Sequence, residues 1–136
     1  MSDLAELTNF ATRYAEAWCS QNPESVAAFF AEDGSLSVND GAPAVGRAAI
    51  AETAQGFMTA FPDMVVTFDK LEPRGAATAF PWTLNGANTG PGGTEKRVRI
   101  TGYELWQINH DGLIAESKGH FDNAEYERQL KHGVDL

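Results

Sequence analysis

The sequence predicts an α+β protein in which a curved antiparallel sheet forms a cone around a long N-terminal helix and encloses a pocket. Helical patterns are grouped in the first half of the chain, and strand patterns follow them as a meander, which is typical of α+β proteins. The first helical pattern carries a long apolar stripe, which needs an apolar surface to cover it. Curling the sheet around this helix buries both surfaces and leaves the kind of cavity that a small-molecule protein needs.

The size and charge of the chain limit the kinds of protein it can be. Its 136 residues suit one domain over residues 1–136, and 43% hydrophobic with 21% charged residues is enough for a packed core. A formal net charge of −9 argues against nucleic acid or an anionic membrane surface as a partner. The chain shows no signal-like start and no apolar run long enough to cross a bilayer, so we expect a cytoplasmic protein.

A capping pattern and an apolar stripe predict the first helix. Asp3 and Glu6 have the spacing of a capping box at a helix start. The stripe has an apolar residue at nearly every turn: Leu4, Leu7, Ala11, Tyr14 and Trp18. Cys19 is the only cysteine, so no internal disulfide can form, and we interpret it as a small buried hydrophobe.

Two more helices and one strand are expected before the main sheet. Asn22 and Pro23 are typical of the N-cap and first position of a helix, here a short one. This helix is expected to end before a short strand at residues 35–39. A third helix is predicted over residues 47–61, where Pro62 stops it.

Four strand patterns follow, and a helix closes the chain. The strands are expected at about residues 64–71, 76–85, 96–110 and 113–121. Pro81 removes a backbone donor from the second of them, so that stretch should lie at an edge or a bulge. Asp122 and Glu125 form a capping box for a terminal helix that reaches about Lys131.

The last hairpin determines which residues share a face of the sheet. Asp111-Gly112 is the strongest hairpin signal in the chain, and as a two-residue turn it pairs His110 with Leu113. One face is then apolar with several small residues, and we expect it to line the inside: Val98, Ile100, Gly102, Glu104, Trp106, Ile108, Ala115, Ser117, Gly119 and Phe121. The opposite face is expected outside: Arg99, Thr101, Tyr103, Leu105, Gln107, Glu116, Lys118 and His120.

Glu104 is the only charged residue on the predicted inner face. Gly119 lies opposite and leaves room beside it. Next to Trp106 and Ile100 a carboxylate loses hydration, which raises its pKa toward the range useful for proton transfer. Glu104 is therefore the candidate catalytic residue. The alternative is that Glu104 pairs with an arginine or reaches water at the mouth of the cone.

The other polar candidates are weaker. His110 falls at a turn tip and His132 near the chain end, so both are expected in solvent, and His120 falls on the outer face. Asp122 is interpreted as a helix cap and not as a base. No Cys/His cluster has metal-ligand spacing, so no metal is expected. The glycines of residues 88–93 lack the strand-to-helix context of a phosphate loop.

Several short stretches, in this order along the chain, resemble SnoaL-like polyketide cyclases. They are FFAEDGSLSVNDGAPAVGRAAI at 29–50, FPDM at 61–64, WTLNGANTG at 82–90 and HDGLIAE at 110–116, with the spacing from Asp122 to Gln129-Leu130. The resemblance implies the cone-shaped fold shared with nuclear transport factor two and ketosteroid isomerases. It also implies a cofactor-free pocket and a homodimer packed through the sheet. Cyclases of the family use a pocket aspartate as acid and base in an aldol closure.

The chain departs from this family at the positions that matter for catalysis. Family members often have a histidine where this chain has Asn88, and a histidine and an aspartate at positions aligning with Ser117 and Gly119. The usual acid and base of the family is therefore missing here. The hairpin register suggests that Glu104 reaches the same volume from the neighbouring strand.

These observations favour a small-molecule enzyme with cofactor-independent acid/base chemistry: isomerisation, aldol-type cyclisation or dehydration of a small apolar or aromatic molecule. Glu104 is the expected catalytic residue. The expected substrate-binding residues are Tyr14, Trp18, Phe57, Phe61, Trp82, Asn88, Trp106, Ser117 and Gly119. The alternative is a non-catalytic module of the same fold that binds a ligand or a protein. A scaffold with a filled cavity is disfavoured by the small residues of the inner face.

Overall fold

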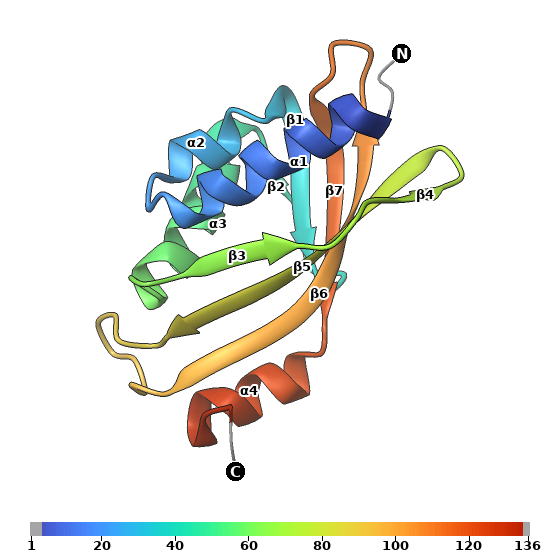
Figure 1. The fold of residues 1–136 in the computed structure, drawn as a ribbon. Coiled ribbons are helices and arrows are strands. Elements are labelled where there is room, and N and C mark those ends of the chain that lie inside the picture. Colours follow the sequence, from blue (N-terminus) through green and yellow to red (C-terminus); the bar gives the residue numbers. More distant parts are fainter. Residues whose placement is uncertain (1–3, 135–136) are drawn as a thin grey trace.

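Three helices pack together against one face of a curved sheet (Figure 1). The protein is described by a computed structural model over residues 4–134, so the predicted capping residue Asp3 lies outside the described residues. The helices are α1 (Leu4–Cys19), α2 (Pro23–Ala27) and α3 (Arg47–Ala60). As the apolar stripe predicts, α1 is buried along one side, at Phe10, Ala11, Tyr14, Ala15, Ala17 and Trp18.

Seven strands form one open sheet beside these helices. They are β1 (Phe30–Val38), β2 (Ala44–Val45), β3 (Val65–Phe68), β4 (Glu72–Arg74), β5 (Ala77–Ala87), β6 (Arg97–Ile108) and β7 (Ile114–Phe121). Their order in the sheet is β2-β1-β7-β6-β5-β3, and β4 also pairs with β5. The predicted α+β class and curved sheet are confirmed with one correction: β1 runs parallel to β7, so the sheet is mixed and not fully antiparallel.

The strand predicted at residues 35–39 begins earlier, at Phe30. The reason is that α2 has only five residues and the chain enters the sheet almost directly after it, with Phe30 fully buried. Glu32 and Asp33 interrupt the apolar pattern, so the sequence does not predict the first part of this strand. Both are exposed, in the part of β1 where the pairing with β7 is irregular.

The β6–β7 hairpin has the predicted faces but not the predicted turn. Glu104 pairs with Gly119, as the register predicts. The predicted pair of His110 and Leu113 is wrong, because the N–H of Asn109 donates to the Leu113 carbonyl at 2.9 Å and three residues form the turn. The Asn109 side chain accepts two N–H groups of this turn and so stabilises it. The faces stay as predicted from Gly102 to Gln107, but a register shift at the end of β6 pairs Ile108 with the fully buried Ile114 in place of Ala115.

Pro81 lies inside β5, beside a break between two neighbouring strands. Its carbonyl accepts a hydrogen bond from the N–H of Asp69 at 3.2 Å, so this side of Pro81 faces the gap between β3 and β4. The N–H and C=O groups of a strand residue point the same way, so the donor that proline lacks falls at this gap. The edge or bulge predicted at Pro81 is therefore the gap between β3 and β4, beside β5.

The last helix, α4 (Asn123–His132), lies at the end of the sheet away from α1 (Figure 1). Asp122 caps it as predicted, because its Oδ1 accepts a hydrogen bond from the N–H of Glu125 at 3.1 Å. The buried Gln129 attaches the helix to β6 by accepting the N–H of Arg99 at 2.7 Å. Within residues 4–134, no helix has both the length and the apolar character needed to cross a membrane.

Substitution of Gly102 by alanine is expected to destabilise the sheet. A Cβ atom at this position would overlap the backbone carbonyl of His120 and lie 2.6 Å from Cζ2 of Trp82. Overpacking of this kind costs about 1–3 kcal/mol. Urea unfolding of Gly102→Ala should therefore give an unfolding free energy about 2 kcal/mol below wild type, because a strand carbonyl cannot move aside.

Gly56→Ala is the matched control for this prediction. Gly56 lies in α3, and a Cβ atom there would have no atom within 4 Å. Alanine at an open helix position stabilises by about 0.5–1 kcal/mol relative to glycine. A Gly102→Ala protein as stable as the Gly56→Ala protein would contradict the tight packing between β6 and β7.

Candidate functional site

Glu104 is a charged residue in the interior of the protein. It lies within β6, and only 7% of its surface is exposed. Gly119 pairs with it on β7, and a Cβ atom on Gly119 would lie 3.8 Å from Cγ of Glu104. A larger residue at position 119 would therefore extend into the space beside the carboxyl group.

Three hydrogen bonds from three elements converge on one carboxyl oxygen of Glu104, Oε1. The hydroxyl of Tyr14 on α1 donates at 2.9 Å, Nε1 of Trp106 on β6 donates at 3.0 Å, and the hydroxyl of Ser117 on β7 donates at 2.7 Å. All three donor residues are fully buried. The protein itself thus supplies every donor that Oε1 has room for, and the orientation of the carboxyl plane is fixed.

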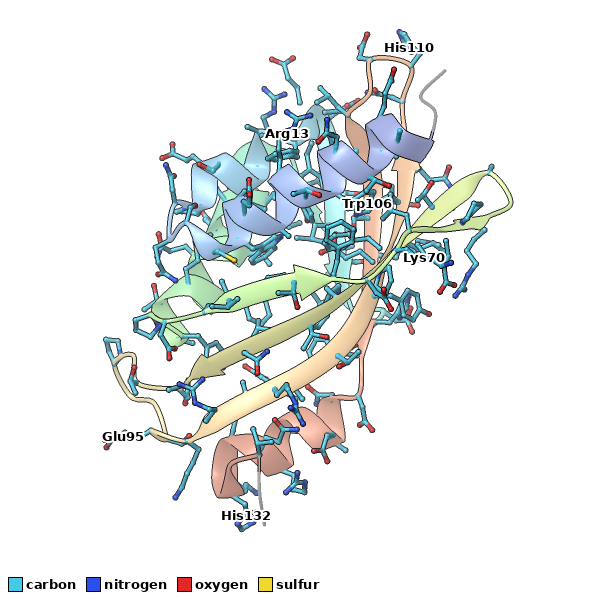
Figure 2. The ribbon with its side chains drawn as sticks, in the orientation of Figure 1. Arg13, Lys70, Glu95, Trp106, His110 and His132 are labelled. Carbon is cyan, nitrogen blue, oxygen red and sulfur yellow. The ribbon has the colours of Figure 1, made fainter. Side chains whose placement is uncertain are left out.

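Aromatic packing holds two of these donors in place. Trp106 stacks on Phe80 of β5, with ring centroids 4.8 Å apart and planes 16° from parallel. The ring of Tyr14 meets Trp106 edge-on at 5.3 Å. Figure 2 shows Trp106 between α1 and the sheet, which is where the network lies. Displacing either ring would cost apolar contacts as well as a hydrogen bond.

The other carboxyl oxygen, Oε2, has a different environment. No described residue donates a hydrogen bond to it. Over residues 4–134, the only fully enclosed polar side-chain atom without a partner is Nη1 of Arg128, so Oε2 is not sealed in the packed interior. Glu104 lines a cavity between the sheet and the helices, and Oε2 is the carboxyl atom free to meet a molecule there.

Burial and hydrogen bonding act on the Glu104 carboxyl in opposite directions. Burial raises its pKa, the hydrogen bonds from Trp106, Ser117 and Tyr14 lower it, and the net pKa is above the ordinary value of 4.5. The pKa of Tyr14 is raised well above 10.0, first by burial and then by the charge of Glu104. Tyr14 therefore remains a hydrogen-bond donor at any ordinary pH. The predicted alternative of an arginine partner is not found for Glu104 among the described ion pairs.

The cavity has an apolar wall that is buried around Glu104 and half-buried elsewhere. Its volume is about 70 Å³. Its buried lining, besides Glu104 and Gly119, consists of Trp18, Leu36, Val66, Phe80, Leu84 and Ile100. The half-buried lining consists of Val38, Thr53, Phe57, Trp82, Phe121 and Tyr126. A ligand that enters from the half-buried part meets Glu104 at the buried part.

The residues expected to bind substrate fall into three groups. Trp18, Phe57, Trp82 and Gly119 line the cavity. Tyr14, Trp106 and Ser117 lie behind the wall and contact Glu104 instead of the cavity. The third group, Phe61 and Asn88, is buried but lies outside the lining.

Asn88 and Phe61 have structural contacts of their own. The amide Nδ2 of Asn88 donates to the Ala60 carbonyl at 3.1 Å, and its Oδ1 accepts the N–H of Thr94 at 2.7 Å. These bonds attach the loop between β5 and β6 to the end of α3. Phe61 is fully buried, and its ring lies 6.3 Å from that of Tyr126. Both residues shape the surroundings of the cavity.

Seven lining residues were not expected from the sequence: Leu36, Val38, Thr53, Val66, Phe80, Leu84 and Tyr126. Phe80 could have been found, because it alternates with Trp82 along β5 and pairs directly with Glu104. The sequence gives no such signal for Thr53, a single polar residue of α3 whose hydroxyl donates to the Ala49 carbonyl of the same helix. Tyr126 reaches the cavity only because α4 docks there, which no local pattern predicts.

The histidines lie outside the cavity. His120 pairs with Tyr103 on the outer face, with ring centroids 5.1 Å apart. His110 and His132 are exposed at the periphery, where Figure 2 labels them. In the part of the chain that the structure describes, no three His, Cys, Asp or Glu side chains gather closely enough to hold a metal ion.

The open curved sheet packed against a long helix is a fold of the ketosteroid isomerase-like class. Residues 8–130 match the family model of the SnoaL-like polyketide cyclases, and the chain belongs to this family. A search among curated proteins finds no significant sequence match. The family resemblance of the sequence is thereby confirmed, and the fold agrees with it.

Solved structures share the fold at low sequence identity. A protein of ketosteroid isomerase-like fold from Catenulispora acidiphila DSM 44928, in complex with trimethylamine, has a TM-score of 0.76 and 20% identity, over 89% of this chain and 91% of its own. A protein described as SnoaL-like polyketide cyclase from Jannaschia sp. CCS1 has a TM-score of 0.81 and 14% identity, over 96% of each chain. SalBIII, an epoxide hydrolase/cyclase-like enzyme, has a TM-score of 0.78 and 16% identity, over 92% of this chain and 97% of its own.

Replacing Glu104 by glutamine tests the raised pKa. The amide oxygen can accept the same three hydrogen bonds, and the NH₂ group then takes the place of Oε2. Because folding raises the pKa of Glu104, its carboxyl destabilises wild type progressively as pH rises from the ordinary pKa through the raised one. In urea unfolding, the stability of Glu104→Gln relative to wild type should increase above about pH 4. The increase should reach about 1.4 kcal/mol for each unit by which folding raises the pKa of Glu104.

Two comparisons make this measurement specific. Hydrogen bonds from the Ala87 N–H to Asp63 and from Arg128 to Glu125 lower the pKa of each acceptor, but both proteins contain these pairs, so their effect cancels. Glu104→Leu leaves three buried donors without an acceptor, at about 1–3 kcal/mol each, and should be far less stable than the glutamine variant. A difference between glutamine variant and wild type that stays constant from about pH 4 to pH 8 would contradict the raised pKa.

Proposed function

We propose that this protein is a cofactor-independent enzyme that binds a small, mainly apolar molecule in the cavity and transfers a proton through Oε2 of Glu104. One observation carries the proposal: three buried donors hold one oxygen of the carboxyl group while the other is left free at the cavity. A group held in this way needs no rearrangement to meet a substrate. Geometry of this kind is the first requirement for general acid/base catalysis.

The surroundings of Glu104 suit it to both directions of proton transfer. Its raised pKa lets the carboxyl group hold a proton closer to neutral pH than an ordinary glutamate does. Once the proton is given away, the donors of Tyr14, Trp106 and Ser117 stabilise the carboxylate that remains. The apolar wall limits competition from water. Isomerisation, aldol-type cyclisation and dehydration each need such a reversible proton carrier.

Family membership supports small-molecule chemistry and restricts its mechanism. The resemblance to SnoaL-like cyclases implies an acid/base aspartate, but the aligned positions hold Ser117 and Gly119. Glu104 faces these two residues from the neighbouring strand and is proposed to act in their place. Among structures of the same fold, SalBIII is described as acting in pyran ring formation in the polyether salinomycin, and another binds trimethylamine. Small molecules of several classes thus remain open as substrates.

The family resemblance also implies a homodimer, and the sequence, with no signal-like start and no membrane-crossing run, predicts a cytoplasmic location; both stay predictions. The outer face of the sheet is the surface proposed for dimerisation. Tyr103 lies on this face, with 36% of its surface exposed, and stacks with His120.

Binding and turnover of the glutamine variant test the proposed function. A thermal-shift screen of small ketones, tertiary alcohols and epoxides identifies ligands, since saturation at about a hundred times Kd adds about 2.7 kcal/mol of stability. Turnover, or exchange of ligand protons in D₂O, is then followed by NMR. Glu104→Gln should keep ligand binding and lose about 10²–10⁴-fold in rate, the usual contribution of a general acid/base.

Thr53→Val is the matched control for turnover. Thr53 lines the cavity, but its hydroxyl bonds to the Ala49 carbonyl, so valine changes the wall without touching Glu104. This variant should retain turnover. Ligands that bind without any reaction in wild type would overturn the enzyme proposal and favour the alternative, a non-catalytic binding module. Equal rates in wild type and Glu104→Gln would remove Glu104 from the mechanism.

A further inference from the structure

The carboxyl group at the cavity has no counter-charge among the described residues. Glu104 is the only charged side chain that they contribute to the lining. The ion pairs of Lys and Arg within residues 4–134 join Arg74 to Glu72, Arg97 to Asp63 and Arg128 to Glu125, and none of them involves Glu104. A buried charge without a partner is strongly disfavoured in a folded protein. The ionised site therefore favours a cation as the missing partner, and it repels an anion.

Aromatic rings make up a large share of the rest of the wall. They come from α1, α3, β5, the end of β7 and α4: Trp18, Phe57, Phe80, Trp82, Phe121 and Tyr126. The face of an aromatic ring carries partial negative charge and attracts ammonium groups, most strongly where water is excluded. The same rings also cover hydrocarbon groups. Both properties match a cation with a small apolar body.

We infer that the cavity takes a small, largely apolar amine, bound as its ammonium ion with an N–H donated to Oε2 of Glu104. The carbon groups of the amine pack against the aromatic wall. The inference rests on the proposed function in that it uses the same cavity and the same oxygen. When Glu104 gives its proton to a neutral amine, the products are one ammonium ion and one carboxylate, so no further reactant is needed.

The size of the cavity limits the amine. The enclosed space of about 70 Å³ is about half that of a 150 Å³ engineered cavity known to bind benzene. A short alkyl group on the nitrogen therefore fits beside Glu104, and a ring or any longer substituent extends toward the half-buried side. Steroid-sized molecules exceed this space.

The pH dependence distinguishes an amine from a neutral carbonyl ligand. An ammonium ion requires ionised Glu104, so its affinity should rise with pH until Glu104 has titrated, with a proton released on binding. A carbonyl oxygen requires protonated Glu104, so its affinity should fall over the same range. Among the described residues, the other titratable groups close to this site are Tyr14, which contacts Glu104 from behind the wall, and Tyr126, which is in the lining, and burial raises the pKa of both.

Pyrrolidine and cyclopentanol form a matched pair of probes. Both have a five-membered ring and a hydrogen-bond donor, but only pyrrolidine is a cation at neutral pH. Calorimetric titration of wild type should show pyrrolidine binding about tenfold or more tightly, from the charge-assisted hydrogen bond and the aromatic faces. Glu104→Gln should lose this preference and keep its affinity for cyclopentanol, whereas Gly56→Ala, which lies outside the lining, should keep the preference.

Each outcome has a defined consequence. Equal or tighter binding of cyclopentanol to wild type would overturn the amine inference but leave proton transfer to a neutral substrate intact. Amine preference with no turnover of any compound would support the inference and overturn the proposed enzyme. Binding of neither probe would overturn the amine inference, and the proposed enzyme would then be decided by the ligand screen and turnover described above. If Glu104→Gln does not fold, the wild-type pH profile decides, because an amine affinity that falls with rising pH excludes the ion pair.

Discussion

The structure depends on satisfying one buried carboxyl group. Glu104 has lost its water, so the protein must replace those hydrogen bonds or keep the group neutral. It replaces them with donors from α1, β6 and β7, which can meet at one oxygen only if the helix has one rotation and the two strands have one register. A slip of either strand by one residue would carry Glu104 or Ser117 to the outer face. The polar network therefore specifies the packing as well as the chemistry.

The hydrogen bonds of the network are distributed unequally between the two carboxyl oxygens of Glu104. All three protein donors act on Oε1, and Oε2 is left to the cavity. Donors on both oxygens would hold the charge more firmly and lower the pKa, but they would leave nothing for a ligand to contact. The pKa of Glu104 is raised because burial outweighs the three hydrogen bonds to Oε1, and no described residue adds a further bond at Oε2 that would lower it. The absence of a donor at Oε2 makes the folded protein less stable and leaves this atom available for chemistry.

The alternation of strand residues predicts much of this site, and long-range contacts account for what it misses. Parity along the β6–β7 hairpin is enough to put Glu104 inside and opposite Gly119, even though the turn itself is longer than predicted. It cannot show that Tyr14, 90 positions earlier in the sequence and predicted as part of the core stripe, points its hydroxyl at that carboxyl group. Nor can local patterns show that β1 lies parallel to β7, because parallel pairing is decided by tertiary packing.

Glu104 and the acid/base position that the family resemblance implies would occupy the same space. A Cβ atom on Gly119 would lie 3.8 Å from Cγ of Glu104, so an aspartate or histidine side chain at position 119 would compete with the glutamate for one volume. The serine at 117 is small enough to donate to Oε1 and too short to reach past it into the cavity. A chain that carries the carboxyl group on β6 therefore requires small residues at these places on β7. The small residues at 117 and 119 and the carboxyl group of Glu104 are therefore parts of one arrangement.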